Sequence, residues 1–343
     1  MKIAVICWAG RNNQGDERML YCIKRYFHKH TVIPFETWSP AESKIDEINA
    51  CDYVLFGGGT LIRRNFNDRY DFLNKIVPPI GCIGITIEAQ KIYKNMRKAV
   101  DLLIEKAEFF YVRDFHSKKV LHNHPKIIVG PDITFLYPFP ILKPTHKDVW
   151  ALNVLDWHWW DAEIHSVQHK IFSHLDTTFP LFKKLYPGKK WDLDDLIRIV
   201  KSRCRHIEPF ALYFDPLFIS GDDLAWKYFK KKIKTFSLKP LKKSRYLISM
   251  RYHGLLFACQ TGIPFISLSY ERKNANFCKD IGLPSLTLQL SDYRKMGGVM
   301  NDVEKNYEVI RQTLLFYRTK ANKDAKYIFE TIESFIEHSQ HLT

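Results

Sequence analysis

An arginine and a histidine stand two residues apart directly after an apolar run, where they could bind one ligand together. The run and its sequel read YLISMRYHGLLFACQTG, with Arg251 and His253 near its middle. If residues 246–250 form a strand, the extended backbone points both side chains to one side of the sheet. Gly254 would let a ligand approach the backbone closely. The structural alternative is a hydrogen-bonded histidine beside an arginine in a salt bridge.

Arg113 is a second arginine at the end of an apolar run. The segment FFYVRDFHSKKVL places Arg113 and Asp114 before a helix that we expect to begin near Ser117. Arginine can hold a carboxylate or a phosphate through two parallel hydrogen bonds, which lysine cannot do. An Arg–Asp pair that caps the helix explains the same residues equally well.

Two more clusters follow apolar runs nearer the N-terminus. In RNNQGDERML, Asn13 and Asp16 open a helix, where acidic residues are common, although Asp16 could also accept a hydrogen bond from a ligand hydroxyl. In FGGGTLIRR, residues 57–59 permit a tight strand-to-helix turn and close backbone approach to a ligand. Their spacing matches neither a Walker A loop nor GxGxxG, so close packing explains them equally well.

A parallel sheet is the element that would position these clusters. The first half of the chain alternates amphipathic segments with the strand-like runs KIAVICW, DYVLFGGG, IGCIGIT, FFYVRD and KIIVGPD. That alternation predicts parallel strands joined by crossover helices. In such sheets ligands bind at the carboxyl ends of the strands, which is where all four clusters fall.

A second sheet is predicted after a proline-rich break. The prolines of YPFPILKPTHK interrupt the pattern, and the next strand-like runs are VWALNVL, PFALYFD, KIKTFSL, YLISM and GIPFISLSY. Apolar residues from residue 302 onward have helical spacing. We therefore expect an N-terminal Rossmann-like domain over 1–143, a C-terminal one with the Arg-x-His pair over 144–301, and closing helices over 302–343.

Composition excludes several classes of protein. The chain is 46% hydrophobic and 26% charged, which excludes a disordered or fibrous protein, and its apolar runs end before bilayer-spanning length. The apolar run of MKIAVICWAG is too short for a signal peptide. Seven scattered cysteines without a CxxC pair predict reduced thiols in the cytoplasm and no zinc site. LHNHP at 121–125 has the composition of a solvated turn.

The net charge of +15 predicts an anionic partner. Its densest part is Lys227 to Arg245, where basic residues are interleaved with Phe and Tyr. This stretch is either a solvated face or a contact with anionic lipid headgroups. We expect no nucleic-acid partner, because the sequence contains no helix-turn-helix, zinc-finger or RNA-recognition motif. Steeply salt-dependent binding to random oligonucleotides would reverse that expectation.

An ordered set of motifs resembles the polysaccharide pyruvyl transferase family. The matching segments are NxGDE at 13–17, GGGTLI at 57–62, VRD at 112–114, GPD at 130–132 and SMRYHGLLFACQTGIPFISLSYERK at 249–273. The last is the most specific, because the family has a Met-Arg-x-His turn, an apolar helix, Gly-x-Pro, a strand and a lysine. Gly254 stands where the family usually has a small residue such as alanine. The aromatic-rich region 156–200 matches no family pattern.

The resemblance implies a GT-B-like architecture, with two Rossmann-like domains facing a central cleft. It also implies transfer of the pyruvyl unit of phosphoenolpyruvate to two hydroxyls of one sugar, as a cyclic ketal. Arg113, Arg251 and Lys273, with the backbone of residues 58–59 (Gly58 and Gly59), would bind the donor's carboxylate and phosphate.

The same resemblance implies a role for a proton donor. His253 would protonate the methylene carbon of phosphoenolpyruvate, since imidazole titrates nearest neutral pH. Asp16 and Asp132 are the candidates for the base that activates the sugar hydroxyl. We expect no metal and no cofactor besides the donor substrate.

The acceptor implied by the resemblance is a glycan, often lipid-linked, as in capsule or cell-surface polysaccharide synthesis. Trp157, Trp159 and Trp160 could stack on its sugar rings or belong to the core. We expect a cytoplasmic enzyme, peripheral at the inner face of the membrane. The alternatives are a GT-B nucleotide-sugar glycosyltransferase and a family member that only binds its ligands. The sequence identifies neither the sugar nor the oligomeric state.

Overall fold

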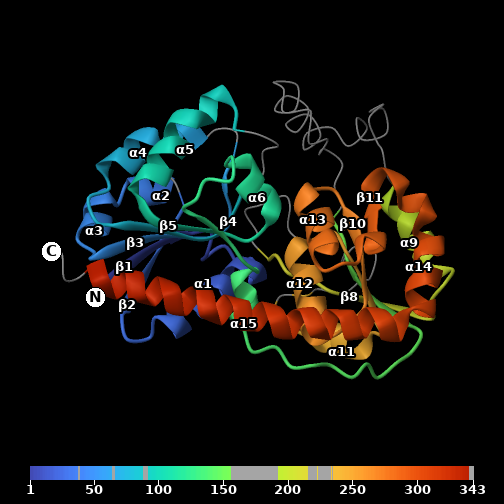
Figure 1. The fold of residues 1–343 in the computed structure, drawn as a ribbon. Helices are drawn as coiled ribbons and strands as arrows, with labels where there is room; N and C mark the ends of the chain where they lie inside the picture. The colour runs from blue at the N-terminus through green and yellow to red at the C-terminus, as the bar shows by residue number, and fades with distance from the viewer. Residues whose placement is uncertain are drawn as a thin grey trace. The chain divides into compact units, whose positions relative to one another are not determined.

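The protein contains two compact α/β units (Figure 1). The computed structural model describes residues 1–37, 39–63, 66–87, 92–155, 192–214, 222, 233 and 235–339. Unit 1 comprises Met1–Pro140 and Phe316–Thr343, and unit 2 comprises Ile141–Leu315. The predicted class, two parallel-sheet domains followed by C-terminal helices, is confirmed.

A six-stranded parallel sheet forms the centre of unit 1. In spatial order its strands are β2 (Thr31–Glu36), β1 (Lys2–Cys7), β3 (Tyr53–Ile62), β4 (Ile80–Ile87), β5 (Ala107–Val112) and β6 (Ile127–Val129). Every neighbouring pair is parallel. Strand β4 is buried along its whole length, as expected for a sheet that is covered on both faces.

Helices cover both faces of this sheet. They are α1 (Gln14–Tyr26), α2 (Ser39–Glu42), α3 (Ile45–Asn49), α4 (Tyr70–Lys75), α5 (Lys94–Lys106), α6 (Phe115–Val120), the 3-10 turns η1 (Phe66–Arg69) and η2 (Ile133–Leu136), and the second part of α15 (Tyr307–Ser339). One apolar core includes residues from α2 to α6, and the other includes residues from α1 and α15. Figure 1 shows α4 and α5 on one side of the sheet and α1 and α15 on the other.

Unit 2 is built on a five-stranded parallel sheet. Its spatial order is β11 (Thr287–Gln289), β10 (Phe265–Ser269), β9 (Tyr246–Ser249), β7 (Val149–Asn153) and β8 (His206–Pro209). Its helices are α9 (Leu193–Lys201), α11 (Lys239–Lys243), α12 (Tyr252–Thr261), α13 (Arg272–Asp280), α14 (Met296–Lys305), and the 3-10 turns η4 (Pro284–Leu286) and η5 (Leu290–Lys295). The first turns of α15 also belong to this unit.

Three assignments of local secondary structure that we made from the sequence, two strands and one turn, are wrong. The described residues of KIKTFSL form no strand, and the strand expected at PFALYFD lies earlier, at β8. The glycine run lies inside β3 and not in a turn. Strands β2 and β11 were not expected, because β2 contains Pro34 at the sheet edge and β11 has only three residues.

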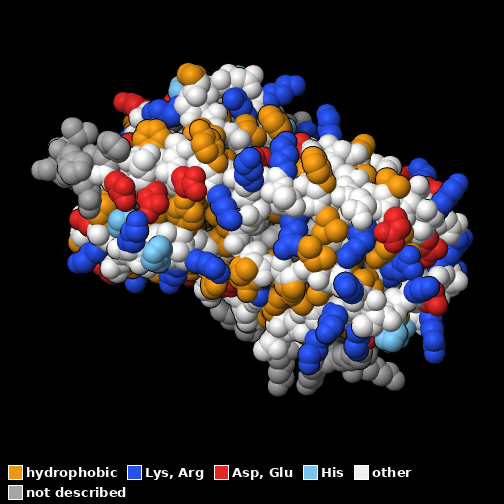
Figure 2. Space-filling view, turned by 60° about the horizontal axis from the view of Figure 1, so that its bottom comes forward, with side chains coloured by type: hydrophobic (Ala, Val, Ile, Leu, Met, Phe, Trp, Pro, Cys, Tyr) orange, Lys and Arg blue, Asp and Glu red, His pale blue; other side chains and the backbone are white. Residues whose placement is uncertain are grey.

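Two features bear on contact with a membrane, namely the helices of the described residues and the charge of the surface. Among those residues, no helix combines the length and apolar character needed to cross a bilayer. Lys and Arg side chains are spread over the face seen in Figure 2, with Asp and Glu side chains among them. Residues 227–232 and 234 of the basic stretch lie outside the described residues, so its contact with lipid headgroups stays a prediction.

We predict that stability falls in alkaline solution because buried thiols resist ionisation. Burial raises the pKa of the Cys7 thiol from 9.0 to about 12 and that of Cys278 to about 11. Above about pH 9 the thiols of the unfolded chain release protons that the buried thiols of the folded chain retain. The stability that the protonated thiols contribute to the folded state is therefore present below that pH and is lost as the pH rises further. Urea titrations should show the free energy of unfolding falling between about pH 8 and about pH 10.5. A Cys7→Ala variant should show a smaller fall, and an identical pH dependence would contradict this account.

Candidate active site

Unit 2 carries a polar cluster where its strand order reverses. The chain runs from β7 to β8 on one side and then to β9 and β10 on the other, so β7 and β9 meet at a topological switch point. Asn153 ends β7 and Ser249 ends β9. Ligands of open α/β sheets bind outside the carboxyl ends of the strands at such points.

Asn153 joins these two strand ends. Its Oδ1 accepts hydrogen bonds from the Ser249 hydroxyl at 2.9 Å and from the Arg251 backbone N–H at 3.3 Å. Its Nδ2 donates to Asp222 at 2.9 Å and to the Phe210 carbonyl at 2.8 Å. The residue is only 1% exposed, so its buried amide is fully hydrogen-bonded and fixes the backbone at Arg251.

Asp222 orients the Arg251 side chain. The carboxylate accepts a hydrogen bond from Arg251 Nε at 2.9 Å and others from the backbone N–H groups of Leu212 and Tyr213 at 2.6 and 3.2 Å. Its side chain is 1% exposed, against 17% for the arginine. Burial by itself lowers the pKa of Arg251, but the negative charge of Asp222 raises the pKa overall. The guanidinium is therefore held in place and charged.

The backbone at Arg251 and His253 is not the strand that we expected. Strand β9 ends at Ser249, Arg251 is the extended N-cap of α12 (φ −78°, ψ 131°), and His253 lies in the first helical turn. The histidine is half-buried, and its ring centroid lies 6.2 Å from that of Phe257. The first turn of a helix carries partial positive charge, which favours an anionic ligand there.

Lys273 lies at the same edge of the same sheet, after the neighbouring strand β10. It forms an ion pair with Glu271, the N-cap of α13. The next residue, Asn274, is fully buried and donates a hydrogen bond of 2.6 Å to the Met250 carbonyl. That bond ties the start of α13 to the residue before Arg251. The structure thus brings the predicted Arg251, His253 and Lys273 to one strand-end region.

Gly254 packs against this cluster, and we predict that a side chain there is destabilising. A Cβ on Gly254 would lie 2.2 Å from Ser249 Oγ and 3.3 Å from Asn153 Oδ1. Because the serine would have to leave its hydrogen bonds, Gly254→Ala should lower the free energy of unfolding by about 1–3 kcal/mol.

The matched control is Gly298→Ala in α14, where a Cβ would meet nothing within 4 Å. Alanine is the better helix former, so this change should raise the free energy of unfolding by up to about 1 kcal/mol. Urea denaturation measures both values, and equal effects from the two substitutions would contradict the packing argument.

Unit 1 holds a buried ion pair at the carboxyl edge of its own sheet. Arg113 follows β5 and donates through Nη1 to Asp132 Oδ2 at 2.7 Å and through Nε to the Thr86 hydroxyl. Asp132 follows β6 and also accepts hydrogen bonds from the Thr134 N–H and hydroxyl, at 2.8 and 2.6 Å. The two charged side chains are 2% and 0% exposed. This network links the ends of β4, β5 and β6.

Asp114 caps the N-terminus of α6 without a contribution from Arg113. Its Oδ1 accepts a hydrogen bond from the Ser117 N–H at 2.7 Å, and its Oδ2 accepts one from the Ser117 hydroxyl at 3.0 Å. The helix begins at Phe115, two residues before the expected start. The expected Arg–Asp cap is therefore a cap made by the aspartate, while Arg113 pairs with Asp132.

Asp16 meets the glycine run at the switch point of unit 1, between β1 and β3. It is a buried residue in the first turn of α1. A Cβ on Gly59 (φ 92°) would lie 3.3 Å from Asp16 Oδ1, and one on Gly58 (φ 71°) would lie 2.8 Å from Met19 Sδ. Close packing of α1 on β3 thus accounts for both glycines, and their contact with a donor substrate stays a prediction.

Sequence reasoning missed Asn153 and Asp222. Asn153 is a polar residue at the end of the buried run VWALN, the same pattern that identified Arg251. Asp222 lies 29 residues before Arg251, and only the folded chain brings them together. No local pattern identifies Asp222 as the partner of that arginine.

Other predicted groups stay untested. Trp157, Trp159 and Trp160 lie outside the described residues. Within the described part of the chain, one group of three potential metal ligands has donor atoms within 4.8 Å of one another, namely His30, Glu333 and Glu337. His30 precedes β2 and so lies at the opposite end of that strand from the carboxyl edge. That the reaction needs no metal remains a prediction.

Two doubly wound parallel sheets, each with polar residues at its switch point, define an α/β protein of the GT-B-like class. Solved structures support that class. Anabaena HepE with UDP and glucose is 10% identical, covering 98% of this chain and 99% of that chain, with a TM-score of 0.54. S. aureus MnaA with UDP is 11% identical, covering 100% and 97%, with a TM-score of 0.54. Apo UGT2 of Phytolacca americana is 10% identical, covering 98% and 99%, with a TM-score of 0.52. Such low identities show the fold alone.

The sequence itself identifies the family. The model of polysaccharide pyruvyl transferases matches residues 8–233 and 237–272, well over half of the chain, so this protein belongs to that family. The match includes Arg113, Arg251 and His253 and ends just before Lys273. The resemblance seen in the ordered motifs is confirmed. No curated protein matches the chain.

Proposed function

We propose that the protein transfers the pyruvyl group of phosphoenolpyruvate to two hydroxyls of one sugar in a glycan, as a cyclic ketal. Membership of the family supports a pyruvyl transferase of polysaccharide synthesis. The observation that carries the finer proposal is the N-terminus of α12, where Asp222 holds the Arg251 side chain, Asn153 holds the Arg251 backbone N–H, and His253 follows two residues later.

The unit 2 strand ends suit the charges of the donor. Phosphoenolpyruvate carries a carboxylate and a phosphate, and Arg251 offers a planar charged donor to either of them. The first turn of α12 adds partial positive charge at the same place. Lys273 supplies a second cation, which is now paired with Glu271.

The chemistry begins with a proton transfer to carbon. His253 donates a proton to the methylene carbon of phosphoenolpyruvate, and the adjacent carbon becomes an electrophilic oxocarbenium centre. The first sugar hydroxyl attacks this centre, forms a C–O bond and releases its proton to a base. The two predicted bases are Asp16 and Asp132, and Asp132 also pairs with Arg113 and accepts a hydrogen bond from Thr134.

The second half of the reaction releases phosphate. The C–O bond to phosphate breaks, and the phosphate leaves with the electron pair while Arg251 stabilises its charge. The second hydroxyl then attacks the same carbon, loses its proton and completes the ketal. One hydroxyl proton restores His253 and the other leaves with phosphate, so the reaction balances without a further reactant.

The acceptor and the location are also part of this proposal. The acceptor is a lipid-linked or polymer-linked glycan of a cell-surface or capsule polysaccharide, and the enzyme works in the cytoplasm at the inner face of the membrane. The excess of basic residues supports contact with an anionic surface. Liposome pelleting should therefore depend on anionic lipid and weaken with salt.

We predict that Arg251→Lys weakens donor binding while keeping the charge beside Asp222. Lysine lacks the planar pair of donors, so the KM for phosphoenolpyruvate should rise by about 10–100-fold. Arg272→Lys is the matched control, because Arg272 is exposed on the first turn of α13. A phosphate-release assay measures both constants. An unchanged KM in Arg251→Lys would remove this residue from the donor site.

A further inference from the structure

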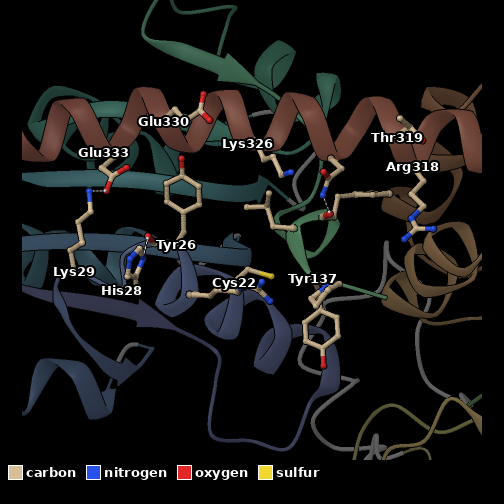
Figure 3. A pocket seen from close by; sticks show the side chains of 15 residues that line it. Cys22, Tyr26, His28, Lys29, Tyr137, Arg318, Thr319, Lys326, Glu330 and Glu333 are labelled. Atoms are coloured by element: carbon tan, nitrogen blue, oxygen red, sulfur yellow. Dashed lines mark hydrogen bonds and ion pairs between the residues drawn. The ribbon is translucent and has the colours of Figure 1, made fainter. Parts of the chain in front are cut away.

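Unit 1 contains a pocket of about 710 Å³ that the proposed chemistry does not use. It lies between the last turns of α1, the segment 135–138 and the part of α15 that belongs to unit 1 (Figure 3). Its volume is in the range of small-molecule binding sites.

The two ends of this pocket carry opposite charge. Arg318 lies toward one end, as does Tyr137, Glu330 and Glu333 line the other, and Lys326 lies between them (Figure 3). Lys29 Nζ lies 3.9 Å from Glu333 Oε1, so the acidic end is partly neutralised. A ligand with charge at one end and hydroxyl groups at the other matches this distribution.

The cationic end is preorganised. Arg318 donates from Nη2 to the Phe139 carbonyl at 2.6 Å, which fixes the guanidinium. Lys326 makes no hydrogen bond or ion pair with the described residues, and Figure 3 shows its amine directed into the pocket. Arg25 at the end of α1 adds a third positive charge to the lining. With Lys29, the lining holds four Lys and Arg side chains, and this excess of positive charge suits a phosphate group, which carries more charge than a carboxylate.

The rest of the lining suits a sugar. The carboxylates of Glu330 and Glu333 can accept hydrogen bonds from sugar hydroxyls. The Tyr26 hydroxyl lies near the acidic end (Figure 3). Burial raises the pKa of Tyr26 to about 12, so its hydroxyl stays protonated and can donate.

We infer that this pocket binds a glycosyl phosphate, with the phosphate at Arg318 and Lys326 and the sugar hydroxyls at Glu330 and Glu333. The inference goes beyond the proposed function and does not depend on it, because the end of the pocket with Lys29 and Glu333 lies just before β2, away from the carboxyl edge of the sheet. Binding itself requires neither phosphoenolpyruvate nor turnover.

Isothermal titration calorimetry on the full-length protein tests the inference. The probes are glucose, galactose and mannose 1-phosphates, the free hexoses and inorganic phosphate. At least one hexose 1-phosphate should bind about tenfold more tightly than its free sugar and than phosphate. A farnesyl ester of the best probe distinguishes a lipid-linked ligand from a free sugar phosphate.

Matched variants locate the binding. Lys326→Ala should weaken hexose 1-phosphate binding about tenfold, while Lys323→Ala, an exposed lysine of the same helix outside the pocket, should leave it unchanged. Glu330→Gln should weaken binding of the hexose 1-phosphate but not of inorganic phosphate. Thermal unfolding of each variant should match the wild type.

Several results would overturn the inference. They are the absence of binding by every hexose 1-phosphate, equal binding of inorganic phosphate, and equal losses in Lys326→Ala and Lys323→Ala. Failure of the proposed transfer would appear separately, as a protein that binds the hexose 1-phosphate but releases no phosphate from phosphoenolpyruvate.

Discussion

A His253→Ala enzyme is expected to release phosphate from phosphoenolpyruvate about 10²–10⁴-fold more slowly than the wild type, because it lacks the proposed general acid. His253 lies in the first turn of α12, two residues from Arg251. No proton would reach the methylene carbon efficiently, so the adjacent carbon would not become electrophilic. The KM for phosphoenolpyruvate should change much less than kcat, because Arg251 and the helix N-terminus remain.

Two controls separate chemistry from folding. His146→Ala removes an exposed histidine of unit 2 and should keep wild-type turnover. Added imidazole should restore part of the activity of His253→Ala, which a merely structural defect would not allow. Near wild-type kcat in His253→Ala would exclude this residue as the acid.

The second large effect is expected from Asp132→Asn. The substitution leaves Arg113 as a buried charge without its carboxylate, and both side chains are almost completely inaccessible to water. Removing one partner of a buried ion pair typically costs about 3–5 kcal/mol of unfolding free energy. Urea denaturation should show a loss of that size.

The matched control is Asp101→Asn in α5. Asp101 pairs with Arg97 at 3.8 Å, but both side chains are about half exposed. An exposed pair contributes at most about 1 kcal/mol, so this variant should remain near the wild type. The double variant Arg113→Met with Asp132→Leu should recover part of the loss, because no buried charge is left unpaired. Equal losses in Asp132→Asn and Asp101→Asn would contradict the assignment of a buried pair.

The ion pair also changes the interpretation of Arg113. Its charge is balanced within unit 1 by Asp132, and its Nε is bound to Thr86. Direct binding of phosphoenolpyruvate by Arg113 therefore stays a prediction. The same network provides a structural reason for an arginine and an aspartate at these two strand ends.

Much of the fold could be predicted from sequence because central strands are strongly apolar. The runs at β4, β5 and β9 are almost entirely buried, so their hydrophobicity identifies them and their order implies parallel pairing. Edge strands β2 and β11 were not predicted, since β2 is only partly buried and contains a proline, and β11 is too short for periodicity to appear.

The sequence predicted which residues form the site more accurately than it predicted the secondary structure on which they lie. Arg251 and His253 stand out because they interrupt an apolar sequence. The start of α12 was missed because its N-cap is Arg251, with no Ser, Thr, Asp or Asn to indicate a helix start. Asp222 was missed because its contacts depend on tertiary structure.

Gly254 shows how the structure can supply a second reason for a residue that the sequence explains in another way. The sequence suggested a close approach of ligand to backbone. In the structure the Ser249 hydroxyl occupies the space in which a Cβ would lie, so internal packing already requires glycine.

The most direct test is incubation with phosphoenolpyruvate and a panel of aryl glycosides and lipid-linked glycans, followed by phosphate assay and mass spectrometry. The proposed function predicts release of one phosphate for each acceptor that gains the mass of pyruvic acid minus one water. It also predicts that both signals fall together in His253→Ala. No such mass gain across the panel, or transfer of a sugar from UDP-glucose without phosphoenolpyruvate, would contradict it.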